Sequence, residues 1–197
     1  MIASPLIDNA GALWKEATTC PFLDALAAGA LPPEAFHRWL AQDYLFAKGL
    51  TGFQSILIAK VPRDCQQTLI AGLGALDKEM AWFQEQGARL ELNLEVGPHP
   101  LCRRYIDFLM RCAYSQPYSV SLAVLFGVEV CYLTAWSSFP PAGPYAEFIE
   151  RWSSASFAAY VSALAELVDR HPHPETEKYF QSVLCREREF WQMAWEG

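Results

Sequence analysis

Charged residues are scarce in this sequence: they make up 19% of its 197 residues, and the formal net charge is −7. No cluster of Lys or Arg interrupts this acidic balance, which argues against a nucleic-acid-binding surface. The six cysteines include no CxxC pair, so we interpret them as reduced, mostly buried thiols of a cytoplasmic protein. The N-terminus has no basic start followed by an apolar run, and we expect no signal peptide.

Several catalytic motifs are also missing. The sequence contains no GxGxxG, P-loop or GxSxG motif, which excludes the common nucleotide-phosphate sites and the serine-hydrolase fold. Only His37 follows a glutamate, Glu34, by three residues, whereas a di-iron bundle requires this Glu-x-x-His spacing on two helices. His37 is the one candidate haem ligand, and its place near a helix start is more typical of a solvent-facing side chain. We therefore expect neither a metal nor a cofactor.

Alternating strand patterns, internal repeats and low-complexity tracts are absent as well. Apolar residues at helical spacing instead predict an all-α fold, a compact helix bundle in a single domain over residues 1–197. Pro and Gly residues mark the breaks between helices, including a turn at His-Pro-His-Pro. Besides a short helix that opens at Pro21, the expected helices cover residues 6–18, 34–60, 63–92, 99–113, 119–139, 145–152, 154–170 and 175–195.

The longest apolar stretch, residues 119–139, has one carboxylate, Glu129, at its middle. At 100° per residue, Tyr132 and Trp136 share the side of Glu129, while Cys131 points roughly the opposite way. The stretch approaches membrane-spanning length, but the central glutamate and the lack of flanking Lys or Arg favour a buried core helix without membrane contact. A buried carboxylate needs a partner, so Glu129 is a candidate functional residue.

Two more carboxylates, Asp43 and Glu187, lie within aromatic helix segments. Phe190 and Trp191 follow Glu187 at the spacing that places them on its helix face. A helix bundle with inward carboxylates and aromatic side chains can hold a polar heteroaromatic ligand. A structural ion pair or a surface charge explains each carboxylate equally simply, above all Glu187, which stands between two arginines.

Four segments, in this order, resemble the TenA/thiaminase II family: CPFLDALAAGALPPEAFHRWLAQDYLFAKGL, LDKEMAWF, VLFGVEVCYLTAW and EREFWQMAW. The similarity extends from Leu13 to Trp195. Each motif alone is weak, whereas the ordered set is specific. The resemblance implies a haem-oxygenase-like all-α bundle, assembled as a homo-oligomer (a tetramer or a dimer), that binds a small aminopyrimidine without metal or haem.

The family's functional residues can be carried over where the motifs match. Asp43, in Gln-Asp-Tyr, matches the aspartate that holds the aminopyrimidine ring, and Phe46 matches an aromatic side chain packed against that ring. Tyr114 resembles a pocket tyrosine before the central helix. Glu187 matches the catalytic glutamate that precedes Phe-Trp. Four other residues are expected to shape or complete the pocket, namely Tyr132, Trp136, Glu79 and Trp82.

The sequence departs from the thiaminase pattern at Glu129, where thiaminases of this family have a nucleophilic cysteine. It instead resembles the branch with glutamate there, the TenA-E group, which is associated with hydrolysis of aminomethylpyrimidine and its N-formyl derivative in thiamin salvage. A carboxylate is a poor substitute for a thiolate nucleophile, whereas two glutamates can divide acid and base catalysis. A thiaminase that uses Cys131 or another thiol, and a non-catalytic pyrimidine-binding oligomer, remain the alternatives.

Overall fold

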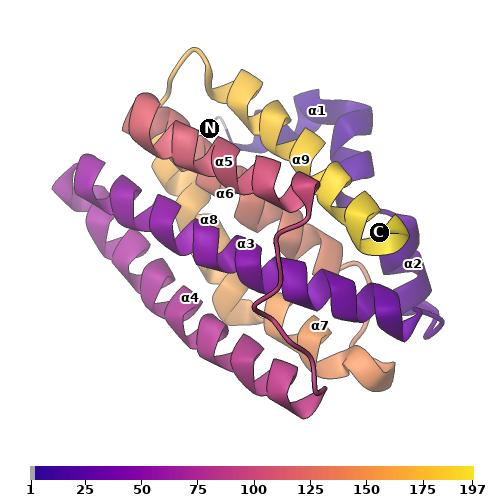
Figure 1. The fold of residues 1–197 in the computed structure, drawn as a ribbon. Coiled ribbons are helices and arrows are strands. Elements are labelled where there is room, and N and C mark those ends of the chain that lie inside the picture. The colour runs from indigo at the N-terminus through magenta and orange to yellow at the C-terminus, as the bar shows by residue number, and fades with distance from the viewer. Residues whose placement is uncertain (1–2) are drawn as a thin grey trace.

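The computed structural model describes residues 3–197. Met1 and Ile2 lie outside the described residues, and the N-terminal segment for which we expect no signal peptide begins with them. The described chain is all-helical, with no strands. Figure 1 shows how its helices are arranged in space. They are α1 (Ala3–Thr18), α2 (Pro21–Ala27), α3 (Pro33–Lys60), α4 (Arg63–Arg89), α5 (Pro100–Ser115), α6 (Tyr118–Trp136), the 3-10 helix η1 (Gly143–Tyr145), α7 (Ala146–Trp152), α8 (Ala155–Arg170) and α9 (Thr176–Glu196).

Prolines set most of the helix starts, as the sequence predicts. A proline occupies the first turn of α2, α3 and α5, where its missing N–H and fixed φ cost nothing. Side chains cap the starts of α5 and α8: His99 accepts a hydrogen bond from the amide of Leu101, and Ser154 accepts one from the amide of Phe157. Within α1, Gly11 adopts a positive φ of 50° and kinks the helix.

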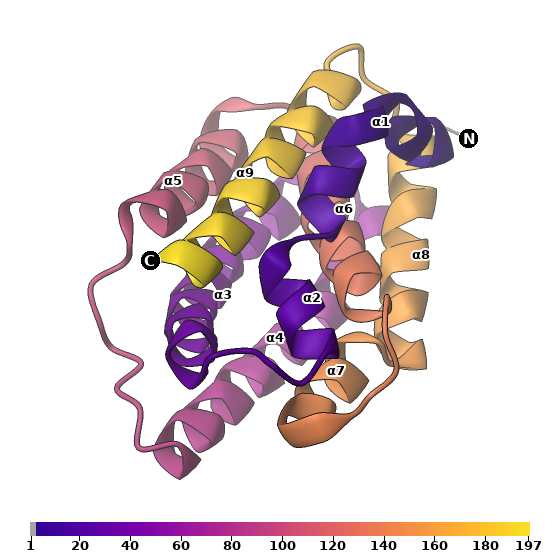
Figure 2. The same cartoon turned by 90° about the vertical axis from the view of Figure 1, so that its right-hand side faces the viewer.

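Helix α6 runs through the interior of the bundle, between α9 and α8 (Figure 2). It is apolar and long enough to cross a membrane, but 78% of its apolar window is buried inside the fold, as in the core helix of a soluble protein. It ends at Trp136, three residues earlier than predicted, and the Pro- and Gly-containing segment that follows separates it from α7. The all-α prediction is confirmed, and the single domain over residues 1–197 stays a prediction.

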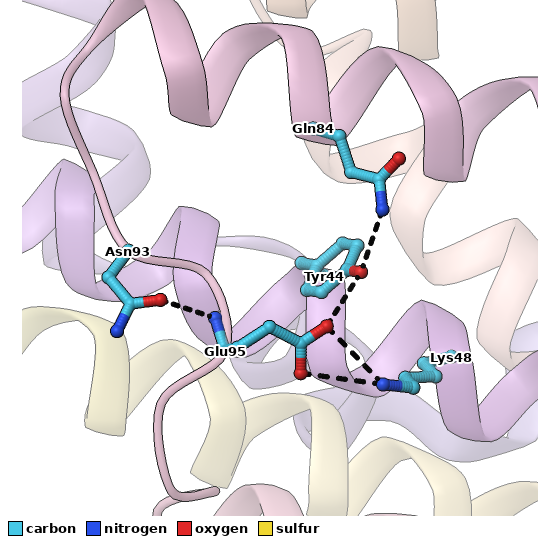
Figure 3. Close-up of polar contacts among 5 residues, drawn as sticks. All are labelled: Tyr44, Lys48, Gln84, Asn93 and Glu95. Carbon is cyan, nitrogen blue, oxygen red and sulfur yellow. Dashed lines mark hydrogen bonds and ion pairs between the residues drawn. The ribbon is translucent and has the colours of Figure 1, made fainter.

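The loop between α4 and α5 is fastened to α3, and the same tyrosine of α3 is bonded to α4 (Figure 3). The Tyr44 hydroxyl donates to Oε1 of Glu95 at 3.1 Å and accepts from Nε2 of Gln84 at 3.3 Å. Lys48 adds an ion pair to Glu95 at 3.4 Å, and the amide of Glu95 donates to Oδ1 of Asn93. These contacts hold α3 against α4, and both helices supply walls of the cavity described next.

Candidate active site

A cavity lies between α3, α4, α6 and α8, and the end of α7 closes part of it. Aromatic side chains from four of these helices make much of its wall: Phe46, Tyr132, Trp152, Phe157 and Tyr160. Three carboxyl groups also face it, from three different helices: Asp43, Glu79 and Glu129. Among the described residues that line it there is no Lys or Arg, so these acids have no cationic partner on the cavity wall.

Burial and mutual repulsion keep protons on these carboxyl groups. Burial raises the pKa of Glu129 to about 8, and the neighbouring charges of Glu79 and Glu187 add to the shift. Burial also raises the pKa of Glu79 to about 7, although its bond to Trp152 opposes the change. The pKa of Asp43 lies well above its usual range, chiefly because of burial. Near neutral pH the cluster therefore holds both protonated and ionised carboxyl groups, which acid–base chemistry needs.

Asp43 is held by a tyrosine of the central helix. The Tyr132 hydroxyl donates a hydrogen bond to Oδ2 of Asp43, which joins α6 to α3. This bond favours the ionised form of Asp43 and thereby opposes the effect of burial on its pKa. The sequence places Tyr132 and Glu129 on one side of α6, and both face the cavity.

Glu187 approaches the cluster from α9. Its side chain is 4% exposed, and the Tyr105 hydroxyl of α5 donates to its Oε1 at 2.5 Å. Burial raises the pKa of Glu187 to about 8. Although Glu187 is not part of the cavity lining, its charge contributes to the raised pKa values of both Glu129 and Asp43, so the four acids form one electrostatic group.

The expectation for Tyr114 is wrong. Tyr114 is 72% exposed at the end of α5, away from the cavity. The buried stripe of α5 contains Tyr105, Leu109 and Cys112, and Tyr114 is nine positions after Tyr105, which turns it to the opposite side of the helix. Tyr105, which sequence reasoning missed, is the α5 tyrosine that reaches the acidic group.

Trp136 and Trp82 lie behind the cavity wall and are not part of it. Trp136 is fully buried, with its ring centroid 6.0 Å from that of Tyr132 and 5.0 Å from that of Trp152. The ring of Trp82 lies 5.6 Å from that of Trp152 and carries the Arg151 guanidinium on its face. Trp152, which no motif identified, both lines the cavity and donates its indole N–H to Oε1 of Glu79 at 3.2 Å.

The model of the TENA/THI-4/PQQC family matches residues 7–197. The chain belongs to this family. A relative from Glycine max, named "Probable bifunctional TENA-E protein", is 25% identical over 203 residues, covering 92% of this chain and 88% of the relative.

Solved TenA structures share the fold of this family member. A TenA homologue from Pyrococcus furiosus superimposes with a TM-score of 0.93 at 26% identity, covering 98% of this chain and all of the homologue. A TenA homologue from Pyrococcus horikoshii gives a TM-score of 0.89 at 23% identity, covering 99% of this chain and 98% of the homologue. The haem-oxygenase-like helical fold is thereby confirmed.

In this TenA-family chain the cavity opens toward the surface through an outer chamber. The two spaces share Gly72, Glu79 and Tyr160 as wall residues. The outer chamber adds the polar side chains of Arg151 and Ser156 where α7 meets α8. A ligand entering here passes these side chains before it reaches the acidic and aromatic interior.

Gly72 sets the shape of this passage, because Tyr160 packs directly on it. A Cβ at position 72 would lie 2.3 Å from the Tyr160 hydroxyl oxygen, so Gly72→Ala forces the ring from its place. We expect this variant to lose about 1–3 kcal/mol of unfolding free energy and to bind a cavity ligand more weakly, as measured by denaturant titration and KM. Gly74→Ala is the matched control, since open space surrounds that position. Equal behaviour of the two variants would contradict the assigned role of Gly72.

The thiol of Cys131 is poorly suited to act as a nucleophile in this TenA-family chain. Cys131 is 1% exposed and does not line the cavity. Burial and the nearby Glu187 carboxylate raise the pKa of Cys131 well above its usual range. Because the thiolate is the reactive form, a neutral buried thiol is expected to be inert.

Proposed function

We propose that this protein is a hydrolase of aminopyrimidine breakdown products of thiamin, acting on aminomethylpyrimidine or its N-formyl derivative, in the glutamate-containing TenA-E branch. The observation that carries the proposal is the cavity itself: aromatic walls surround carboxyl groups whose pKa values lie near neutrality, and Glu129 is the residue we align with the thiaminase cysteine. Family membership supports a thiamin-related hydrolase role.

Asp43 and the aromatic wall provide the binding site for the ring. An aminopyrimidine carries an amino group beside a ring nitrogen, and a carboxyl group pairs with that edge through two hydrogen bonds. Asp43 presents such a group, oriented by Tyr132. Phe46 lies one helical turn after Asp43 on the same wall and supplies an apolar face for the ring.

Glu129, which lines the cavity, and Glu187, which lies outside the lining within electrostatic range of Glu129, divide the acid and base work. Substrate binding has to be accompanied by a movement of the Glu187 side chain into the cavity. One carboxylate takes a proton from water as the water oxygen bonds to the formyl carbon or to the carbon that carries the amine. The other, as a carboxylic acid, gives its proton to the nitrogen as the carbon–nitrogen bond breaks and the amine leaves. Burial raises the pKa of each to about 8, which keeps a proton available for the acid step near neutral pH. Tyr105 fixes the position of Glu187.

The two alternatives predict different chemistry. A thiaminase needs a thiolate at the pyrimidine methylene, and the buried, neutral thiol of Cys131 offers none. A non-catalytic binding protein has no need for several carboxyl groups with pKa values near neutrality in one cavity. We further propose, from the family resemblance, that the chain forms a homo-oligomer. From its composition and charge pattern we propose that it is cytoplasmic and binds neither nucleic acid nor a membrane.

Incubation with thiamin, aminomethylpyrimidine and formylaminopyrimidine in parallel tests this proposal, with products followed by chromatography. We expect turnover of one or both pyrimidines and loss of about 10²- to 10⁴-fold in kcat on Glu187→Gln, because a glutamine cannot transfer the proton. Glu177→Gln, exposed on the same helix, is the control and should keep full activity. Turnover of thiamin alone, or equal turnover by Glu187→Gln, would reject the proposed reaction.

A further inference from the structure

A second polar cluster lies outside the cavity, where the start of α4 meets the end of α8. Asp64 and Cys65 are in the first turn of α4, and His171 directly follows α8. The Cys65 sulfur is 3.1 Å from Nε2 of His171, and that nitrogen is 3.8 Å from Oδ2 of Asp64. Their ligand atoms all lie within 4.8 Å of one another, although 106 residues separate Cys65 from His171 in the sequence.

We propose that Asp64, Cys65 and His171 form a binding site for a zinc ion. A thiolate, an imidazole and a carboxylate are the ligand types that Zn²⁺ takes in proteins, at bond lengths of about 2.0–2.3 Å. The ligand atoms already stand near the separations of a tetrahedral site, so small side-chain movements complete it. The thiol proton passes to solvent on binding. One Zn²⁺ then balances the charges of one thiolate and one carboxylate.

Neighbouring side chains orient two of the three ligands. The Tyr118 hydroxyl lies 3.3 Å from Nδ1 of His171. When Nδ1–H donates to this hydroxyl, the lone pair of Nε2 points toward Cys65, which is the arrangement that metal-binding histidines use. Arg170 donates to Oδ2 of Asp64 at 2.9 Å, and the Cys65 thiol donates to Oδ1 at 3.9 Å. The positive charge of Arg170 opposes cation binding, and the two anionic ligands outweigh it.

The accessibility of the cluster fits a metal site with one open coordination position. Cys65 is fully buried, whereas the side chain of Asp64 is 53% exposed, so an ion can enter from the side of Asp64. Water can then supply the fourth ligand. The sequence-based expectation of no metal rested on Glu-x-x-His spacing and could not see ligands brought together by the fold.

A zinc ion here would join α4 to α8 near their ends. These two helices contribute Glu79 and Tyr160 to the cavity wall, and the outer chamber opens between them. The ion would therefore stabilise the spacing of the cavity walls and would not take part in the hydrolysis. The inference does not depend on the proposed function.

The test is a zinc titration of purified, chelator-treated protein by calorimetry, with the Tm measured at each zinc concentration. We expect one Zn²⁺ per chain and a Tm that rises with zinc. Tyr118→Phe should weaken the affinity by about 10- to 100-fold, and Cys65→Ser or His171→Gln should weaken it by at least as much. Co²⁺ in place of zinc should give a thiolate charge-transfer absorption band that is lost in Cys65→Ser.

Matched controls separate this site from adventitious binding. Cys185→Ser and His173→Gln remove the same chemical groups elsewhere and should leave the zinc affinity unchanged. Asp64→Asn changes an exposed side chain, so it provides a folded ligand variant should Cys65→Ser or His171→Gln fail to fold. Absence of stoichiometric binding, or an affinity equal to that of the wild type in the Asp64→Asn and Cys65→Ser variants, would overturn the proposal.

Discussion

Replacing Glu129 with glutamine is expected to lower kcat for the aminopyrimidine substrates by about 10²- to 10⁴-fold, because the variant loses one partner of the acid–base pair. Glutamine keeps the size and the hydrogen-bonding capacity of the side chain, so the cavity and the ring-binding groups stay in place. KM should therefore change little, and the loss should appear in kcat. Steady-state kinetics of the purified variant with each pyrimidine measures both constants.

Glu85→Gln is the matched control for this experiment. Glu85 is exposed on α4, next to the cavity-forming segment of that helix, so its replacement removes one negative charge without touching the acidic group. We expect wild-type kinetics from it. A Glu129→Gln enzyme with unchanged kcat would show that Glu129 neither gives nor takes a proton. A higher KM with unchanged kcat would assign it to substrate binding alone.

Helix positions could be predicted from the sequence because Pro and Gly residues mark nearly every break. The predicted range 34–60 differs by one residue from α3, and 154–170 differs by one from α8. Two helix ends were predicted less well: α4 stops at Arg89, three residues before the expected Leu92, and α6 stops at Trp136, three residues before the expected Phe139. A helix end that is set by where the chain turns back, and not by a particular residue, is only weakly indicated by the sequence.

The acidic residues of the cavity could be predicted because burying a carboxylate is energetically unfavourable, so a carboxylate within an apolar segment indicates a functional residue. Asp43 and Glu129 sit among apolar neighbours in the sequence, and both face one cavity in the structure. Trp152 was missed, since a tryptophan at the end of a short helix has the same pattern whether it packs in the core or lines a cavity. The Cys65–His171 contact was missed because only the tertiary fold joins residues so distant in sequence.

The unfolding free energy is expected to fall by several kcal/mol as the pH rises from about 5 to about 8, owing to the carboxyl groups of the cavity. The pKa of Glu79 is raised to about 7 and the pKa values of Glu129 and Glu187 to about 8, from 4.5. Between these limits the folded state holds protons that the unfolded chain has released. Stability is therefore fully present below pH 4.5 and is lost as the pH passes through the folded-state values. Urea titrations across this range measure the slope.

Glu129→Gln should make the protein more stable at pH 8, although it removes activity. Each unit of pKa shift corresponds to about 1.4 kcal/mol, and water in the cavity screens part of this, so we expect a gain of roughly 1–3 kcal/mol at pH 8 and little at pH 5. Glu85→Gln should leave the pH dependence unchanged, because its side chain is exposed in the folded and unfolded states alike. If the unfolding free energies of the wild type and Glu129→Gln changed with pH in the same way, Glu129 would be ionised in the folded protein throughout this range. That result would contradict its role as a proton carrier near neutral pH.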